Sequence, residues 1–229
     1  MINVALLGFG RIGQMHAQNI YLNKTLNLLY VYEKIDKLRK KAKNLYNCKI
    51  EKDYKKIFSN EKVDIIFISS PTNTHIRFIE EGIKYNKTIF CEKPLDLNIN
   101  KIVKTFKKVK KNNSKIQMGF NRRFDPGHYS IKKDLEKGKI GRLEKIIITS
   151  RDPAPPSKAY FKSSGGIFRD MMIHDFDLCR YYLNKDEISE ISSSVSSFEN
   201  FYKKIKDHEL ATVTMKSKNG VKCVITNSR

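Results

Sequence analysis

The fold is decided by residues 2–13, INVALLGFGRIG. An apolar run typical of a buried strand ends directly in Gly8, Gly10 and Gly13, and this G-x-G-x-x-G spacing is typical of a dinucleotide-binding turn. The first glycine permits a tight turn, the second lets the backbone approach a pyrophosphate, and the third lets a helix pack close to the strand. Because amides at a helix N-terminus attract phosphate, a helix that begins near residue 11 would complete such a site.

Further apolar runs follow in the first half of the chain, and stretches with helical periodicity separate them. The runs are NLLYVYE, VDIIFISS, KTIFCEK and KIQMGF, and the helical stretches cover residues 11–22, 36–46, 73–85 and 98–112. Continuous apolar strands that alternate with helices are typical of a parallel sheet with both faces covered. We therefore predict an α/β fold for residues 1–120, a Rossmann domain with a doubly wound parallel sheet.

The pattern changes after residue 120. A helix is predicted near residues 125–137, then a long strand, a Pro-rich PAPP segment and a helix over residues 165–178. Three strand candidates follow with no helix between them, namely EISEISSSVSSF, HELATVTMKS and GVKCVITNS. This order predicts an α+β domain over residues 121–229, with an open, mainly antiparallel sheet and a helix on one face.

The charge of the chain suggests a polyanionic partner. Against 24 Asp and Glu stand 45 Lys and Arg, which gives a formal net charge of +21. However, the lysines are scattered over polar helix positions or lie in one run at residues 101–115, instead of interleaving with aromatic residues on one platform. No zinc-finger, RNP or basic-zipper pattern accompanies them. We therefore expect no specific nucleic-acid partner.

The cysteines and the apolar segments indicate the cellular compartment. Four cysteines lie within apolar stretches without a CxxC pair, as expected for reduced core thiols of a cytoplasmic protein. No segment approaches the length of a membrane span, and the N-terminus lacks the pattern of a signal peptide. The histidines show no ligand spacing with cysteines or carboxylates, so we expect no metal site.

An acidic residue at the end of the second strand supports a dinucleotide site. Glu33 follows Gly13 by twenty residues, where a carboxylate can accept hydrogen bonds from ribose hydroxyls. The same carboxylate would repel a 2′-phosphate, so we expect NAD in preference to NADP, although Lys34 beside it weakens this preference.

Two later strand ends add candidates for the cofactor site. SSPTNTH at residues 69–75 and CEKP at residues 91–94 each follow an apolar run, and open α/β sheets bind ligands at the carboxyl ends of their strands. The alternatives are N-capping of a helix by Thr72 and a solvated surface position for Lys93. The candidate cofactor-binding residues are Gly8, Gly10, Arg11, Ile12, Gly13, Glu33, Ser70, Pro71, Thr72, His75, Glu92 and Lys93.

A row of polar residues lies in the segment GGIFRDMMIHDFDL at residues 165–178. Asp170, His174 and Asp177 follow the helical spacings i, i+4 and i+7, so they would share one face of a helix. One explanation is the solvated face of an amphipathic helix. The other is a catalytic group, because a histidine with an ordinary pKa of about 6.5 suits a general base near neutral pH.

The order of the motifs resembles the Gfo/Idh/MocA family of oxidoreductases. The matching motifs are GFGRIG, SSPTNTH, CEKP, GFNRRFDP and SGGIFRDMMIHDFD, which together span essentially the whole chain. The run TSRDPAPP before the last motif is similar to the bacterial inositol 2-dehydrogenase branch of that family. The resemblance implies NAD(P)-dependent hydride transfer from a ring hydroxyl of myo-inositol or a related cyclitol or sugar, and a homo-oligomer built on the second domain.

The resemblance also implies roles for single residues. The catalytic lysine of the family's EKP motif matches Lys93, and an aspartate and a histidine four residues apart match Asp170 and His174. Family positions near the substrate, and weaker similarity at the end of the long strand, supply further substrate contacts. The substrate-binding candidates are Lys93, Arg123, Arg151, Asp152, Asp170, His174 and Asp177.

The family pattern differs from this chain in length. Members usually continue with further strands and helices after the segment that corresponds to VITNSR, so we expect the second domain to be incomplete. An alternative to the dehydrogenase is therefore a non-catalytic NAD-binding fragment or interaction module derived from the same family. Intact Lys93, Asp170 and His174 favour the dehydrogenase.

Overall fold

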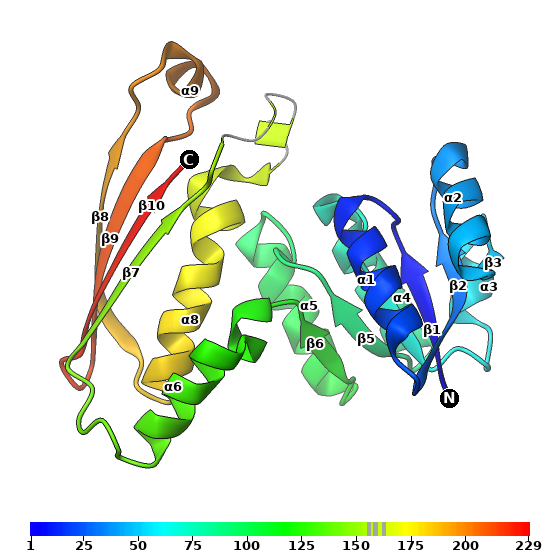
Figure 1. The fold of residues 1–229 in the computed structure, drawn as a ribbon, viewed down its shortest axis with the longest axis horizontal. Helices are drawn as coiled ribbons and strands as arrows, with labels where there is room; N and C mark the ends of the chain where they lie inside the picture. The colour runs from blue at the N-terminus through cyan, green and yellow to red at the C-terminus, as the bar shows by residue number, and fades with distance from the viewer. Residues whose placement is uncertain (155–156, 158–159, 162–163) are drawn as a thin grey trace. The chain divides into compact units, whose positions relative to one another are not determined.

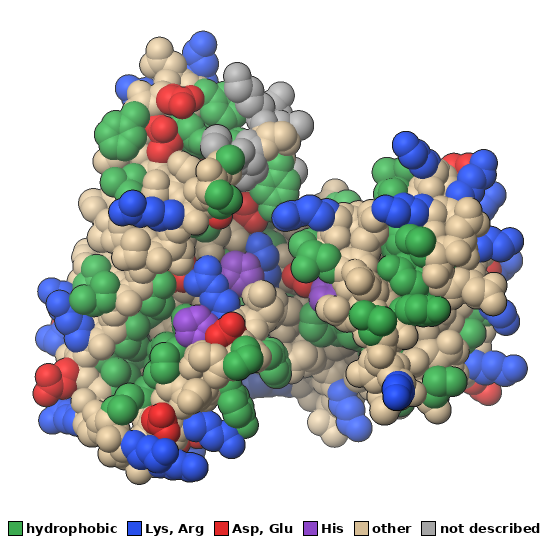
Figure 2. All heavy atoms as spheres, in the orientation of Figure 1, with side chains coloured by type: hydrophobic (Ala, Val, Ile, Leu, Met, Phe, Trp, Pro, Cys, Tyr) green, Lys and Arg blue, Asp and Glu red, His purple; other side chains and the backbone are tan. Residues whose placement is uncertain are grey.

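A computed structural model describes residues 1–154, 157, 160–161 and 164–229. The chain consists of two compact units, unit 1 (Met1–Gly119) and unit 2 (Phe120–Arg229) (Figure 1). Part of the predicted PAPP segment, residues 155–156, lies outside the described residues. Within the described ranges, no helix is long and apolar enough to cross a membrane. Figure 2 shows lysine and arginine side chains spread over the visible face instead of gathered in one patch.

Unit 1 is built on a six-stranded parallel sheet in the order β3-β2-β1-β4-β5-β6. The strands are β1 (Ile2–Leu7), β2 (Leu26–Tyr32), β3 (Lys49–Ile50), β4 (Ile65–Ile68), β5 (Thr88–Cys91) and β6 (Ile116–Met118). The strand order reverses between β1 and β4, and such a reversal opens a crevice at the carboxyl ends of the strands where these sheets bind ligands. The five strands predicted from the sequence are confirmed. The two residues of β3 are too few to show a pattern.

Helices cover both faces of this sheet. They are α1 (Arg11–Leu22), α2 (Asp36–Tyr46), α3 (Tyr54–Phe58), the 3₁₀ turn η1 (Thr72–Thr74), α4 (His75–Lys84) and α5 (Ile99–Lys111). The pleat of β1 divides its side chains between two cores. Val4 and Leu6 pack in a cluster with residues of α1 and α2, whereas Ala5 and Leu7 pack in a cluster with residues of α3, α4 and α5. Burial on both faces explains why the strands are continuous apolar runs.

Unit 2 contains a four-stranded sheet in the order β7-β10-β9-β8. Its strands are β7 (Lys145–Arg151), β8 (Ile188–Ser196), β9 (Leu210–Ser217) and β10 (Lys222–Ser228). β9 pairs antiparallel with β8 and β10, whereas β7 and β10 are parallel. The helical segments of unit 2 include η2 (Asn121–Phe124), α6 (Pro126–Glu136), the π-helical turn η3 (Phe168–Met172), α8 (Ile173–Leu183) and α9 (Asn200–Ile205).

Two predictions for unit 2 need correction. The sequence showed no helix between the last three strands, but α9 lies between β8 and β9, and its six residues are too few to show helical periodicity. The predicted helix at residues 165–178 is not uniformly α-helical, because η3 forms a π-turn before α8. A π-turn closes i to i+5 hydrogen bonds, so Asp170 and His174 do not follow regular α-helical spacing. Met172 and Cys179 of this segment pack in the core of unit 2.

A buried carboxylate that the sequence pattern missed connects α8 to the sheet. Asp175 is fully buried, and its Oδ1 forms an ion pair with Arg122 of η2. The same Oδ1 accepts a hydrogen bond from Ser150 Oγ at 3.0 Å, and Oδ2 accepts one from Asn227 Nδ2 at 2.9 Å. Ser150 and Asn227 are register partners on β7 and β10. One side chain therefore fastens α8 to two strands and to the first turn of unit 2.

We predict that Asp175→Ala lowers the free energy of unfolding by about 3 kcal/mol, because it leaves a guanidinium and two polar groups without their acceptor. Asp175→Asn should cost less, because the amide keeps one acceptor oxygen. Urea denaturation measures both, with Glu190→Ala as the control, since the ion pair of Glu190 with Lys216 lies on the surface. A loss below about 1 kcal/mol for Asp175→Ala would show that the network does not hold the unit together.

Candidate active site

The glycine turn after β1 is closed to a side chain at two of its glycines, where a Cβ would collide with the backbone, and open at the third. Gly8 has a φ of +96°, and a Cβ on it would lie 2.6 Å from Ser70 Cα. A Cβ on Gly13 would lie 2.2 Å from Gly8 O, so α1 lies directly against the turn. A Cβ on Gly10, by contrast, would meet nothing within 4 Å. This arrangement fits a phosphate group that approaches the backbone at Gly10.

The first turn of α1 supplies amides near Gly10. Gly10 is the N-cap residue of α1, and no side chain among the described residues caps the helix. The amides of Arg11 and Ile12 lie in this first turn, where a helix leaves N–H groups without intrahelical partners. Such amides, together with the helix dipole, attract anions. We therefore expect Arg11 and Ile12 to contact a cofactor through their backbone amides.

Glu33 supports the same turn from the end of β2. Its carboxylate accepts the N–H groups of Phe9 at 2.7 Å, of Lys34 at 2.7 Å and of Ile35 at 3.0 Å. A carboxylate can accept about four hydrogen bonds, so capacity remains beyond these three. Contact of Glu33 with a ribose hydroxyl stays a prediction, and the structure adds that the side chain fixes the Gly8–Gly10 turn to β2.

The loop after β4 is tied both to the glycine turn and to itself. Ser69 Oγ donates to Gly8 O at 2.9 Å, and the hydroxyls of Ser70 and Thr74 lie 2.6 Å apart. Pro71 precedes η1, and Thr72 begins it. The alternative of N-capping by Thr72 receives no support among the described contacts, because the N-cap residue of η1 is Pro71 and that of α4 is Thr74.

His75, at the start of α4, connects this loop to the next strand end. The residue is 1% exposed; its Nε2 lies 2.8 Å from Ser70 O and its Nδ1 lies 2.9 Å from Pro94 O. Burial lowers the pKa of His75 below its ordinary value, while the two carbonyl oxygens act in the opposite direction. The described contacts of His75 join two backbone segments, and its contact with a cofactor stays a prediction.

The CEKP segment begins at Cys91, the last residue of β5. Glu92 Oε1 lies 2.7 Å from His16 Nε2 of α1, and Glu92 Oε2 accepts the N–H of Lys93 at 3.2 Å. The Lys93–Pro94 peptide bond is cis. Lys93 is half-buried and lies at the carboxyl end of its strand, which is the edge where open α/β sheets bind ligands.

In unit 2, the carboxylate of Asp170 is held on both oxygens. Its Oδ1 accepts a hydrogen bond from the Tyr160 hydroxyl at 2.7 Å, and its Oδ2 accepts one from Arg229 Nη2 at 3.1 Å. The Arg229 side chain is fully buried and also donates from Nη1 to Asp207 Oδ2 at 2.8 Å. Asp170 therefore has a fixed orientation in η3, and half-buried His174 follows it in the first turn of α8.

The structure brings Arg123 and Asp177 together, as a pair with each other. Arg123 Nε donates to Asp177 Oδ2 at 2.7 Å, and Arg123 Nη2 donates to Asp177 Oδ1 at 2.5 Å. These hydrogen bonds raise the pKa of Arg123 above its ordinary value. The guanidinium also lies over the ring of Tyr181, at 5.4 Å from its centroid. The fork joins η2 to α8 and keeps both side chains in one place.

Arg151 and Asp152 are not brought to the same face as Asp170 and His174. Side chains alternate along β7, and Ser150 points to the α8 side, so Arg151 lies on the opposite face of the sheet. Asp152 is exposed, and its N–H donates to Ser228 O at 3.0 Å. Contact of these two residues with a substrate stays a prediction, and no described contact supports it.

Sequence reasoning missed the partners of the site residues. The sequence contains a signal for the pair of Arg122 and Asp175, because Asp175 lies on the buried side of an amphipathic helix and a buried carboxylate needs a partner. His16 gave none, because its partner Glu92 lies 76 residues away.

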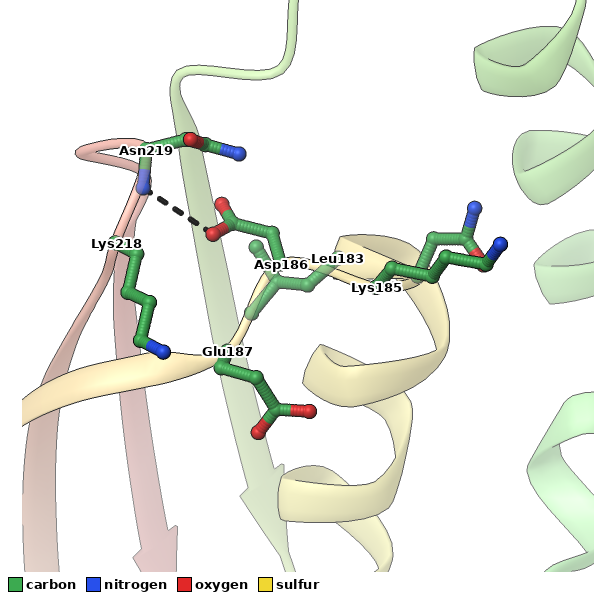
Figure 3. A pocket seen from close by; sticks show the side chains of 7 residues that line it. Leu183, Lys185, Asp186, Glu187, Lys218 and Asn219 are labelled. Carbon is green, nitrogen blue, oxygen red and sulfur yellow. Dashed lines mark hydrogen bonds between the residues drawn. The ribbon is translucent and has the colours of Figure 1, made fainter.

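An open pocket lies at the far end of α8 and belongs to no predicted site (Figure 3). It is lined by Leu183, Asn184, Lys185, Asp186, Glu187, Lys218 and Asn219. The N–H of Asn219 donates to Asp186 Oδ1 at 3.1 Å across it. His174 lies in the first turn of α8 and Leu183 at its end, so most of this helix separates the pocket from His174.

Comparisons with known proteins agree along the whole chain. The model of the oxidoreductase family with an NAD-binding Rossmann fold, GFO_IDH_MocA, matches residues 2–120, and the GFO/IDH/MocA C-terminal domain matches residues 128–229. Inositol 2-dehydrogenase of Rhizobium meliloti (strain 1021) is 35% identical over 228 residues, which cover 100% of this chain and 69% of that protein. Myo-inositol 2-dehydrogenase of Thermotoga maritima is 37% identical over 231 residues, with coverage of 100% and 69%.

A solved structure extends this likeness to a bound state. The crystal structure of scyllo-inositol dehydrogenase from Lactobacillus casei with bound cofactor NAD(H) and scyllo-inositol has a TM-score of 0.90 and 28% sequence identity to this chain. The match covers 100% of this chain and 70% of that chain.

The glycine turn predicts a separation of stability from cofactor binding. Gly13→Ala should lower the free energy of unfolding by about 1–3 kcal/mol, because its methyl group would collide with Gly8 O. Gly10→Ala should change stability by less than about 1 kcal/mol but weaken NADH binding at least about tenfold, because its methyl group enters the open space. Urea denaturation and NADH fluorescence titration measure the two effects, and equal stability losses would contradict the assignment.

The lowered pKa of His75 predicts a pH dependence of stability. Below about pH 6.5 the unfolded chain binds a proton that the buried ring resists, so the free energy of unfolding should fall as the pH drops from 6.5 toward the lower pKa of the folded state. His75→Gln should weaken this fall, whereas His128→Gln should leave it in place. Urea denaturation between about pH 7.5 and 5 provides the measurement. Equal slopes for wild type and His75→Gln would refute the prediction.

Proposed function

Because the chain belongs to the GFO/IDH/MocA family of NAD-binding oxidoreductases, we propose that it oxidises a ring hydroxyl of myo-inositol or of a related cyclitol or sugar. The coarser statement holds independently: the chain is an NAD-binding oxidoreductase of the inositol dehydrogenase kind. The observation that carries the proposal is the glycine turn, closed at Gly8 and Gly13 and open at Gly10, at the carboxyl edge of the same parallel sheet whose strand β5 leads to Lys93.

The residues around this turn suit NAD, which when bound accepts the hydride from the alcohol carbon. The amides at Gly10 and in the first turn of α1 would hold the pyrophosphate. Glu33 would accept hydrogen bonds from ribose hydroxyls with its remaining capacity, and its negative charge disfavours a 2′-phosphate. NADP is therefore the less suitable cofactor.

We assign proton transfer to His174 of unit 2. As the hydroxyl is oxidised, His174 would take its proton, which an imidazole can do near neutral pH. Asp170 would orient the imidazole or hold a neighbouring hydroxyl, and its own carboxylate is fixed by Tyr160 and Arg229. Lys93 would stabilise the negative charge that develops on the alcohol oxygen.

The pair of Arg123 and Asp177 suits a substrate that carries several hydroxyls. The side chain of Arg123 is 40% exposed, and of its five N–H donors the fork to Asp177 uses two. The remaining donors are held in a defined direction by the pair and could bind ring hydroxyls. We likewise propose that the protein acts in the cytoplasm and as a homo-oligomer, as expected for the family.

The test is NADH formation by the purified chain with NAD and a panel of inositols and hexoses. We expect turnover on an inositol, and His174→Ala should lower kcat at least about a hundredfold while NADH binding stays within a few-fold of wild type. His128→Gln serves as the matched control, since its ring bonds to the Tyr182 hydroxyl and takes no part in the proposed reaction. Retained turnover in His174→Ala would refute its role, and bound NADH without any turnover would favour the non-catalytic alternative.

A further inference from the structure

Histidine side chains hold the residues on both sides of Lys93. On one side, His16 Nε2 lies 2.7 Å from Glu92 Oε1, and Glu92 Oε2 accepts the backbone N–H of Lys93 at 3.2 Å. On the other side, His75 Nδ1 lies 2.9 Å from the carbonyl oxygen of Pro94. The two histidines come from different helices, α1 and α4. The backbone of the lysine is therefore fixed from two directions.

Each histidine is in turn held by a second element. The His16 side chain is 19% exposed, and its ring packs edge-on against Phe67 of β4 and Phe90 of β5, at centroid distances of 5.7 and 5.1 Å. The ring of His75 is buried, and its Nε2 lies 2.8 Å from Ser70 O in the loop after β4. Both rings therefore have little freedom to move. Their contacts with Glu92 and Pro94 restrain the segment after β5.

We propose that His16 and His75 are positioning residues that set the starting point of the Lys93 side chain, an inference that rests on the proposed function because it gives Lys93 a part in the reaction. A lysine reaches its target through a flexible four-carbon stem, so the backbone at its root limits where the ammonium group can go. A displacement of about 1 Å at a reacting group can cost about a hundredfold in rate. Neither histidine needs to touch the substrate for this effect.

The competing explanation is that His16 only fills space between aromatic rings, and two substitutions separate the two roles. His16→Gln keeps an N–H donor for Glu92 but loses the ring, whereas His16→Phe keeps the ring contacts but loses the donor. Positioning through Glu92 predicts that His16→Phe lowers kcat at least about tenfold and that His16→Gln stays within about threefold of wild type. The KM for NAD should change little in either variant. The opposite order of the two variants would overturn the proposal.

A similar pair tests His75. The amide of asparagine reaches the position of Nδ1, which faces Pro94, and the amide of glutamine reaches that of Nε2, which faces Ser70. His75→Asn should therefore retain more of kcat than His75→Gln, although both lose packing. His128→Gln is the control and should leave kcat unchanged. Equal kcat losses in the two His75 variants would overturn the role of the Pro94 contact.

Hydrogen exchange of the Lys93 amide keeps this proposal separate from the proposed function, because it needs no turnover. The N–H of Lys93 is bonded to Glu92 Oε2, so His16→Phe should speed its exchange at least about tenfold relative to His16→Gln at equal global stability. Absence of turnover in the wild type with this exchange difference would refute the proposed function alone. Equal exchange in the two variants would overturn the positioning role, whatever the turnover.

Discussion

The closeness of α1 to the turn after β1 is the constraint on which unit 1 depends. A Cβ on Gly13 would lie 2.2 Å from Gly8 O, so only glycine lets the helix begin so near the end of the strand. The same closeness sets the first amides of α1 beside Gly10, where space is open. Ser69 and Glu33 bond to this turn from the ends of β4 and β2. Three strand ends are thus fixed together in advance, which lowers the ordering cost of binding a dinucleotide.

In unit 2 the adjacent residues Arg122 and Arg123 form ion pairs in different surroundings, one with a buried carboxylate and one nearer the surface. Arg122 pairs with fully buried Asp175, and Arg123 pairs with Asp177 although the Arg123 side chain is 40% exposed. Two residues along an α-helix turn the side chain by about 200°, so the two aspartates point to nearly opposite faces of α8. Arg122 therefore helps to fasten the helix to the sheet, and Arg123 forms a fork with Asp177 that leaves some of its N–H donors unused by that pair. The resemblance named Arg123 as a candidate substrate contact, and only the structure shows the pairing of Arg122 with Asp175.

How much the sequence could predict depended on how local each feature is. Burial on both faces makes the strands of unit 1 continuous apolar runs, so the alternation with helices predicted the parallel sheet. Short elements such as β3 and α9 leave no periodicity to detect, and the π-turn at Phe168–Met172 changes hydrogen bonds without changing any residue type. For the site, glycine spacing predicted the turn because Gly8 and Gly13 each meet a steric requirement at their own backbone position.

The contacts that orient the site could not be predicted, because their partners are far apart in the sequence. Arg122 and Asp175 are 53 residues apart, and His16 and Glu92 are 76 apart. A charge or a polar ring in the interior must find a partner, since leaving it without one costs several kcal/mol, but the topology alone decides which partner it meets. The same cost makes these pairs hard to exchange for other arrangements. Contacts such as that of His16 with Glu92 therefore fix the backbone at Lys93, which the flexible lysine side chain cannot do for itself.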